Sequence, residues 1–283
     1  YQEVEDFTQF VPVTKFNAHV NAVTRMPDLL RQAFREATSG TPGPVHLQIQ
    51  NFNGELSEQE ADLYPRIEPG YASVPAFRPE PEIKQVLGAV AALSKAKKPI
   101  IVAGGGVVKS GAQAEVVALA EKLQIPVITS LNAKGTILDS HRLSVGVSGT
   151  YSRDCANSAL LEADLVFFIG SSAGSMITHF WCYPPAGTPV IQLDINPSEL
   201  GRNYPNVVSI MGDAKISLIR MLQAAQPKPP EAAKPWTERV QALVEKWHVE
   251  NEPHRSSDAV PIRPERICKE LSEMLPPDGV VVS

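Results

Sequence analysis

Short apolar runs alternate with longer amphipathic stretches through the middle of the chain. The run LVFFIG at 165–170 is continuously apolar, which is typical of a strand covered by helices on both faces. The stretch 112–124 instead places Val116, Leu119 and Leu123 at helical spacing. This pattern predicts strands at 99–103, 126–130, 165–170, 189–195 and 207–211, and helices at 82–93, 112–124, 153–162 and 213–224. Strands that alternate with helices predict an α/β fold with a doubly wound, Rossmann-like parallel sheet.

Prolines mark the limits of this sheet domain. They gather at 64–82 and at 226–235, and proline-rich segments behave as semi-rigid spacers because proline donates no backbone hydrogen bond. We therefore interpret both stretches as interdomain linkers. The predicted division is an N-terminal piece at 1–50, a linker at 51–80, the central domain at 81–225, a second linker at 226–258 and a C-terminal piece at 259–283.

Composition and charge narrow the class of protein. A net charge of −5 gives no basic footprint for nucleic acid, so we expect no nucleic-acid partner. No apolar stretch approaches the roughly 18 residues that span a membrane, so we expect no membrane partner either. The acidic start, with Glu3, Glu5 and Asp6, argues against a signal peptide. Three cysteines without a Cys-x-x-Cys pair indicate a reduced, cytoplasmic protein without a structural zinc.

The most conspicuous motif is IIVAGGGVVKSGA, in which Gly104 to Gly106 follow a predicted strand. Three glycines permit a turn with positive φ between strand and helix. A dinucleotide fingerprint fails because its sixth position is Lys109, and a phosphate-binding P-loop fails because Gly-Lys-Ser is absent. A structural turn and a ligand-binding loop both stay open.

Further candidates follow from the rule that ligands bind at the carboxyl ends of parallel strands. Asp194 is suited to a ribose hydroxyl or, equally, to an Asx turn into Asn196, whereas Asp213 is suited to cap its helix. We expect structural roles for His46 and assign no catalytic role to any histidine. The candidate cofactor-binding residues are Gly104, Gly105, Gly106, Gly149, Thr150, Gly170, Ser171, Asp194, Asn196 and Asp213. No catalytic residue and no metal ligand is predicted in this chain.

Three stretches resemble one family in the right order. RMPDLLRQAFREATSGTPGPVHLQI at 25–49 resembles the end of the pyrimidine-binding domain of thiamine diphosphate-dependent enzymes of the acetolactate synthase and 2-oxo acid decarboxylase superfamily. KKPIIVAGGGV, ALLEADLVFFIG and VIQLDINPSELGRNYPNVVSIMGDA resemble that family's middle domain. RPERICKELSEMLPPDGVVVS at 263–283 resembles the start of the diphosphate-binding domain. The resemblance implies a complete middle domain flanked by incomplete α/β cofactor-binding domains.

The resemblance also implies a function for the parent protein. Members of the family cleave or form carbon-carbon bonds next to a carbonyl, use thiamine diphosphate and Mg²⁺, act on 2-oxo acids or related substrates, and assemble as homodimers or homotetramers. Their cofactor-activating glutamate lies before the stretch at 25–49, and their metal-binding Gly-Asp-Gly segment lies after the strand that is expected to end at Ser283. We therefore expect this chain to be a fragment that lacks the catalytic elements.

The middle domain of this family binds FAD in some members, ADP in others and no nucleotide in many. FAD-binding members tend to carry a histidine before Gly-Thr and an arginine in the segment after the strand like 165–170. Here Ser148 precedes Gly149, and SSAGSM at 171–176 has no arginine. Both departures weaken the FAD interpretation, and we favour an empty site over FAD or ADP. The alternative function is a stand-alone Rossmann-like nucleotide-binding or regulatory module without catalysis.

Overall fold

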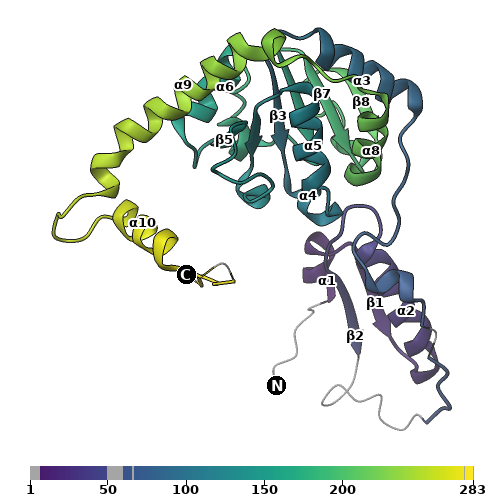
Figure 1. Cartoon of the computed structure of the whole chain (residues 1–283). Helices are drawn as coiled ribbons and strands as arrows, with labels where there is room; N and C mark the ends of the chain where they lie inside the picture. The colour runs from purple at the N-terminus through teal and green to yellow at the C-terminus, as the bar shows by residue number, and fades with distance from the viewer. Residues whose placement is uncertain (1–6, 50–59, 66, 277, 283) are drawn as a thin grey trace.

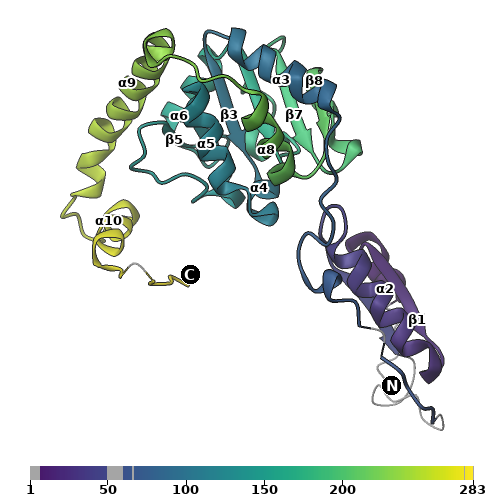
Figure 2. The same ribbon diagram turned by 45° about the vertical axis from the view of Figure 1, so that its right-hand side comes forward.

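The computed structural model describes residues 7–49, 60–65, 67–276 and 278–282. Figure 1 shows a central sheet domain, an N-terminal piece and a helical C-terminal arm. In Figures 1 and 2 the N-terminal piece and the C-terminal arm lie on either side of the central domain.

The central domain is built on six parallel strands. In space their order is β5-β4-β3-β6-β7-β8. The strands are β3 (Pro99–Ala103), β4 (Val127–Thr129), β5 (Ser144–Val147), β6 (Leu165–Ile169), β7 (Val190–Asp194) and β8 (Asn206–Met211). The chain builds outward from β3 to β5 and then crosses over to β6, so the order of strands reverses between β3 and β6. The predicted doubly wound α/β sheet is confirmed, and its switch point lies at the glycine motif.

Helices cover both faces of this sheet, and each face has its own apolar core. Ile101 and Phe167 point into one core, whereas Ile100 and Phe168 point into the other. All four are fully or almost fully buried, which explains why these strands are apolar at every position. The first core is covered by α3 (Ile83–Lys95), α5 (Gln113–Leu123) and α8 (Ala214–Ala224), and the second by α6 (Asp154–Glu162) and α9 (Pro230–Arg255).

Three differences from the sequence prediction concern β5, the glycine motif and the second linker. β5 was missed because its sequence, SVGV, is short and holds a serine and a glycine among its four residues. The expected positive-φ turn at 104–106 is wrong: Gly104 has φ −102° and is the N-cap of a short helix, α4 (Gly105–Ser110). None of the three glycines falls in the left-handed region.

The proline-rich second linker is the third difference, because residues 230–255 form the continuous helix α9. Pro230 lies in the first turn of the helix, where a missing N–H costs nothing, whereas Pro235 and Pro253 lie inside it and each removes one internal hydrogen bond. Burial of Trp236 and Val240 against the sheet offsets that loss. The indole Nε1 of Trp236 also donates to the Pro99 carbonyl at 2.9 Å. Irregular spacer structure is therefore wrong for 230–255, while the domain boundaries themselves stay a prediction.

The N-terminal piece is a parallel strand pair with a crossover helix. It contains α1 (Phe7–Phe10), β1 (Phe16–Val20), α2 (Met26–Thr38) and β2 (Val45–Ile49), with Phe16 paired to Val45. The helix and strand predicted within 25–49 are confirmed. The remaining described elements are α7 (Ser175–Thr178), α10 (Pro264–Met274) and short 3₁₀ turns at Val11–Val13, Val23–Arg25, Pro69–Ala72, Leu131–Ala133 and Pro197–Glu199.

Candidate functional site

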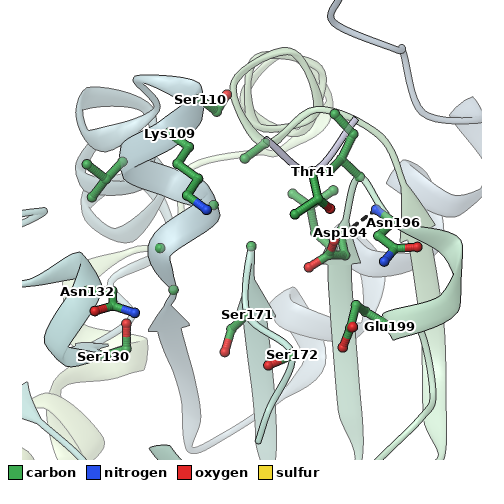
Figure 3. A pocket seen from close by; sticks show the side chains of 18 of the residues that line it. Thr41, Lys109, Ser110, Ser130, Asn132, Ser171, Ser172, Asp194, Asn196 and Glu199 are labelled. Carbon is green, nitrogen blue, oxygen red and sulfur yellow. Dashed lines mark hydrogen bonds between the residues drawn. The ribbon is translucent and has the colours of Figure 1, made fainter. Parts of the chain in front are cut away.

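A cleft of about 870 Å³ opens at the carboxyl ends of the central strands. Loops after β3, β4, β5, β6, β7 and β8 all contribute to it, as the topology requires. The N-terminal piece closes one side through Gly40, Thr41 and Pro42, together with Pro75 of the connecting segment. Figure 3 shows Lys109 of α4 on one side of the cleft and Asp194 with Glu199 on the other.

Most of the predicted candidate residues meet at this cleft. Eight of the ten line it: Gly104, Gly105, Gly106, Gly170, Ser171, Asp194, Asn196 and Asp213. Gly149 and Thr150 lie between two residues that line it, Ser148 and Tyr151. Gly149 is needed for packing, because it has φ +102° and a Cβ there would lie 1.9 Å from the Met176 carbonyl oxygen. Binding of a ligand by any of these residues stays a prediction.

Two of the three consecutive glycines, Gly104 and Gly106, leave no room for a side chain. A Cβ on Gly104 would lie 2.3 Å from the Gly170 carbonyl oxygen, and one on Gly106 would lie 2.7 Å from the Gly170 Cα. The Gly104 N–H donates to the Ile169 oxygen at 2.8 Å and the Gly106 N–H donates to the Gly170 oxygen at 2.9 Å. These two glycines therefore allow the β3 to α4 turn to pack against the end of β6.

Gly105 differs from its two neighbours. Its added Cβ would meet only the Cβ of Asn132, at an ordinary contact distance of 3.4 Å, and both residues line the cleft. The absence of a side chain at Gly105 is thus not required by packing. It leaves the cleft wall open at this point.

Asp194 has a local partner and faces the cleft. Its Oδ1 accepts the N–H of Asn196 at 2.9 Å, which is the Asx turn considered from the sequence. Asn196 in turn accepts the Ser198 N–H at 3.0 Å and caps the 3₁₀ turn that follows. Burial raises the pKa of the Asp194 carboxyl above its ordinary value, and the nearby Glu199 carboxylate raises it further. The ionised carboxylate is therefore partly desolvated and would gain from an additional hydrogen-bond donor.

Asp213 is occupied by protein donors. Its side chain is 2% exposed and accepts the Ile216 N–H at 3.1 Å, so the predicted helix cap is confirmed. Arg78 donates to its Oδ1 at 2.9 Å and the Ser110 hydroxyl donates to its Oδ2 at 2.7 Å. The cap and these two contacts account for the burial of this carboxylate without a ligand.

The described part of the chain shows no second candidate site built on histidines or on metal ligands. His46 lies in β2 with its Nδ1 2.6 Å from the Asn17 Oδ1, and its ring stacks on Phe10, as a structural histidine would. Nowhere among the residues with described positions do three His, Cys, Asp or Glu side chains gather as metal ligands. Within the same residues, no helix combines the length and the apolar character needed to cross a membrane.

Sequence reasoning missed the contributions from outside the central domain. Thr41 and Pro42 line the cleft although they belong to the N-terminal piece, and Arg78 reaches the cleft edge from the connecting segment. These three residues could not be predicted from the positions of strand ends, because their place at the cleft depends on how separate parts of the chain pack. The residue types around these positions, mainly proline and glycine, match no catalytic or ligand-binding motif.

Comparisons with known proteins agree with this architecture. Residues 86–222 match the thiamine pyrophosphate enzyme central domain family. The probable acetolactate synthase large subunit of Methanocaldococcus jannaschii is 32% identical over 277 residues, which cover 97% of this chain and 46% of that protein. The acetolactate synthase large subunit of Corynebacterium glutamicum is 31% identical over 99% of this chain and 44% of its own length.

A relative with a different name shows similar coverage. The glyoxylate carboligase of Escherichia coli O157:H7 is 31% identical over 93% of this chain and 43% of its own length. The chain thus spans less than half of the length of each of these relatives. Together with the six-stranded parallel sheet, the match shows that the chain belongs to the thiamine pyrophosphate enzyme family, with residues 86–222 forming its central domain.

Proposed function

We propose that this chain is the middle portion of a thiamine pyrophosphate-dependent enzyme that forms or cleaves a carbon-carbon bond next to a carbonyl. The observation that carries this proposal is the extent of the similarity. Acetolactate synthases and a glyoxylate carboligase match 93% or more of the chain, which includes both pieces outside the central domain. On this proposal, 1–50 ends a pyrimidine-binding domain and 259–283 begins a diphosphate-binding domain. The intervening segments are the connections at 51–80 and 226–258.

Exposed apolar side chains on both pieces support this division. Phe34 of α2 is 57% exposed, and α10 holds Ile267 and Leu271 at about 40% exposure. Large apolar residues grouped on one element are normally covered by another layer. We propose that the remaining elements of the two cofactor-binding domains provide this cover. Assembly as a homodimer or homotetramer belongs to the same proposal.

The described residues do not fit the cofactor by themselves. Among them there is no group of carboxylates or histidines arranged for the Mg²⁺ ion that accompanies thiamine pyrophosphate. When bound, the cofactor supplies an electron sink for the carbon that loses its substituent. We therefore derive no catalytic step from this chain and assign its cofactor contacts to other parts of the longer protein. The substrate class we propose is 2-oxo acids, as in the acetolactate synthase relatives.

A direct test compares two forms of the protein. The product of the complete gene, with a mass about twice the 30.7 kDa of this chain, is supplied with thiamine pyrophosphate, Mg²⁺ and pyruvate or glyoxylate. We expect carbon dioxide release and a carboligation product from the longer form only, and no micromolar cofactor binding by the 283-residue chain in calorimetry. A native gene product of 30.7 kDa without turnover would refute the proposal and favour a stand-alone module.

The second candidate function is nucleotide binding by the central domain, with ADP or FAD as ligand. The observation that favours it is the charge arrangement of the cleft. Lys109 forms no ion pair within the described residues, while Asp194 on the opposite side is partly desolvated. Phosphates beside Gly105 and Lys109 and a ribose hydroxyl at Asp194 would match these two sides.

Titration of the chain with ADP and FAD tests this second function. We expect Gly105→Val to abolish binding while the domain stays folded, because only a side chain in the cleft is added. Gly70→Val is the matched control, because Gly70 lies outside the cleft, has no positive φ and has no atom within 4 Å of an added Cβ. Absence of binding by the unmodified chain would leave the cleft without a nucleotide.

A further inference from the structure

Arg78 joins the connecting segment to the central domain at the edge of the cleft. Its Nη1 donates to the Asp213 Oδ1 at 2.9 Å, to the Ser110 carbonyl at 2.9 Å and to the Ser110 hydroxyl at 3.0 Å. Ser110 ends α4 and Asp213 caps α8, and both line the cleft. One guanidinium therefore binds the ends of two helices that form the cleft.

The backbone beside Arg78 makes two further contacts of the same kind. The Asp213 N–H donates to the Pro79 carbonyl at 2.9 Å, which holds the connecting segment against the start of α8. The Ala76 N–H donates to the carbonyl of Thr38, the last residue of α2, at 3.1 Å. Residues 76–79 are thus bound to the N-terminal piece at one end and to the central domain at the other.

The N-terminal piece, to which residues 76–79 are bound, forms one side of the cleft. Gly40, Thr41 and Pro42 follow α2 directly, so their position depends on how α2 is held. We propose that Arg78 is a positioning residue, which fixes residues 76–79 on Ser110 and Asp213 and thereby fixes the 40–42 loop as a wall of the cleft. This inference goes beyond the proposed function, since it requires neither thiamine pyrophosphate nor a nucleotide.

A neighbouring ion pair provides a matched comparison. Arg220 of α8 binds Glu80 of the same segment at 2.8 Å, with side chains 41% and 59% exposed. An exposed pair of this kind contributes little because water screens it. The acceptor of Arg78 is instead 2% exposed, although the Arg78 side chain itself is 34% exposed, so water competes less for this hydrogen bond. The burial of Asp213 assigns the holding role to Arg78 rather than to Arg220.

The experiment measures the distance between the two sides of the cleft in the ligand-free chain. Nitroxide labels are placed at Thr41→Cys and at the exposed Lys134→Cys, in a background with Cys182→Ser and Cys268→Ser. Pulsed electron resonance then gives the width of the distance distribution. Hydrogen exchange of the Ala76 and Asp213 amides is followed in parallel.

We expect a narrow distribution in the parent chain and at least a twofold wider one after Arg78→Met, with about tenfold faster exchange at both amides. Arg78→Lys, which keeps the charge, should lie between them, and Arg220→Met should match the parent. Arg78→Met with Asp213→Asn leaves no unpaired buried charge and should also widen the distribution at least twofold over the parent chain, so it tests the inference even where the single change unfolds the domain.

Three results would overturn the inference. One is an unchanged distribution in both Arg78→Met variants, which would limit Arg78 to a contribution to stability. Another is equal broadening after Arg220→Met, which would show that any ion pair between this segment and the central domain holds the loop equally well. The third is loss of amide protection throughout β3 and β6 in the double variant, because a positioning role predicts local opening only.

Discussion

Substitution of the three consecutive glycines by alanine separates packing from ligand access. The perturbation adds one methyl group at each position in turn. At Gly104 the methyl carbon would lie 2.3 Å from the Gly170 oxygen and 2.6 Å from the Ser171 Cβ, and at Gly106 it would lie 2.7 Å from the Gly170 Cα. At Gly105 the nearest atom is the Asn132 Cβ at 3.4 Å.

The magnitudes follow from these distances. Overpacking costs about 1–3 kcal/mol, and the upper end applies to Gly104 because the opposing atoms include backbone that cannot rotate away. Movement of this turn also weakens the hydrogen bond from the Gly104 N–H to the Ile169 oxygen, worth about 1 kcal/mol. We therefore expect Gly104→Ala to lower the free energy of unfolding by about 3–4 kcal/mol. Gly106→Ala should cost about 2–3 kcal/mol.

Gly105→Ala should change stability in the opposite direction. The position is the first residue of α4, its space is open, and alanine restricts the unfolded chain more than glycine does. A gain of about 0.5–1 kcal/mol is expected. Urea unfolding followed by far-ultraviolet circular dichroism measures all three variants. Equal stability of Gly104→Ala and Gly105→Ala would refute the distinction between a packed turn and an open cleft wall.

Three other outcomes are expected. Trp236→Phe should destabilise the domain by about 1–2 kcal/mol, because the hydrogen bond to the Pro99 carbonyl is lost, and an unchanged urea midpoint would place α9 outside the cooperative unit. Burial raises the pKa of the Cys155 thiol to about 11, so the folded state binds more protons than the unfolded state between pH 9 and 11. The thiol should contribute a fall in stability of about 2 kcal/mol across that window, and Cys155→Ala should make the fall smaller by that amount, as unfolding at several pH values can check. Asp194→Asn keeps an oxygen for the Asn196 N–H but removes a carboxyl whose pKa burial has raised, so stability at pH 7 should be equal or higher. In the parent chain, the raised pKa of Asp194 should make stability decrease as pH rises just above the ordinary pKa of a carboxyl, and the Asp194→Asn variant should lack this decrease. A loss of stability at pH 7 in the variant would contradict the reasoning.

The central domain was predictable because its strands are buried on both faces. In a continuous apolar run such as 165–170, alternate side chains pack into the cores on the two faces of the sheet, and few other structures require that pattern. The strand ends then placed most candidate residues at one cleft by topology alone. β5 escaped because its serine and glycine are buried by the surrounding chain and carry no apolar signal of their own.

The second linker shows where proline content misleads. Proline breaks a helix when it falls in the middle, yet Pro230 begins α9 and Pro235 lies just before Trp236. The two hydrogen bonds lost at Pro235 and Pro253 are small beside the burial of an indole and a valine on the sheet. The spacing of Trp236 and Val240, one helical turn apart, carried the helical signal that the proline count obscured.

Asp194 and Asp213 show why a site cannot be assigned from strand ends alone. Both follow or end a strand, and the sequence suggested a turn or cap for each. Asp213 meets Arg78, which lies 135 residues earlier, and Ser110, which lies 103 residues earlier, so its acceptors are used by groups that no local pattern could supply. Asp194 accepts from Asn196, two residues away, and keeps a raised pKa. Donors that come from distant parts of the chain therefore decide which carboxylate is structural, and the one that has only local partners is the candidate for binding a ligand hydroxyl.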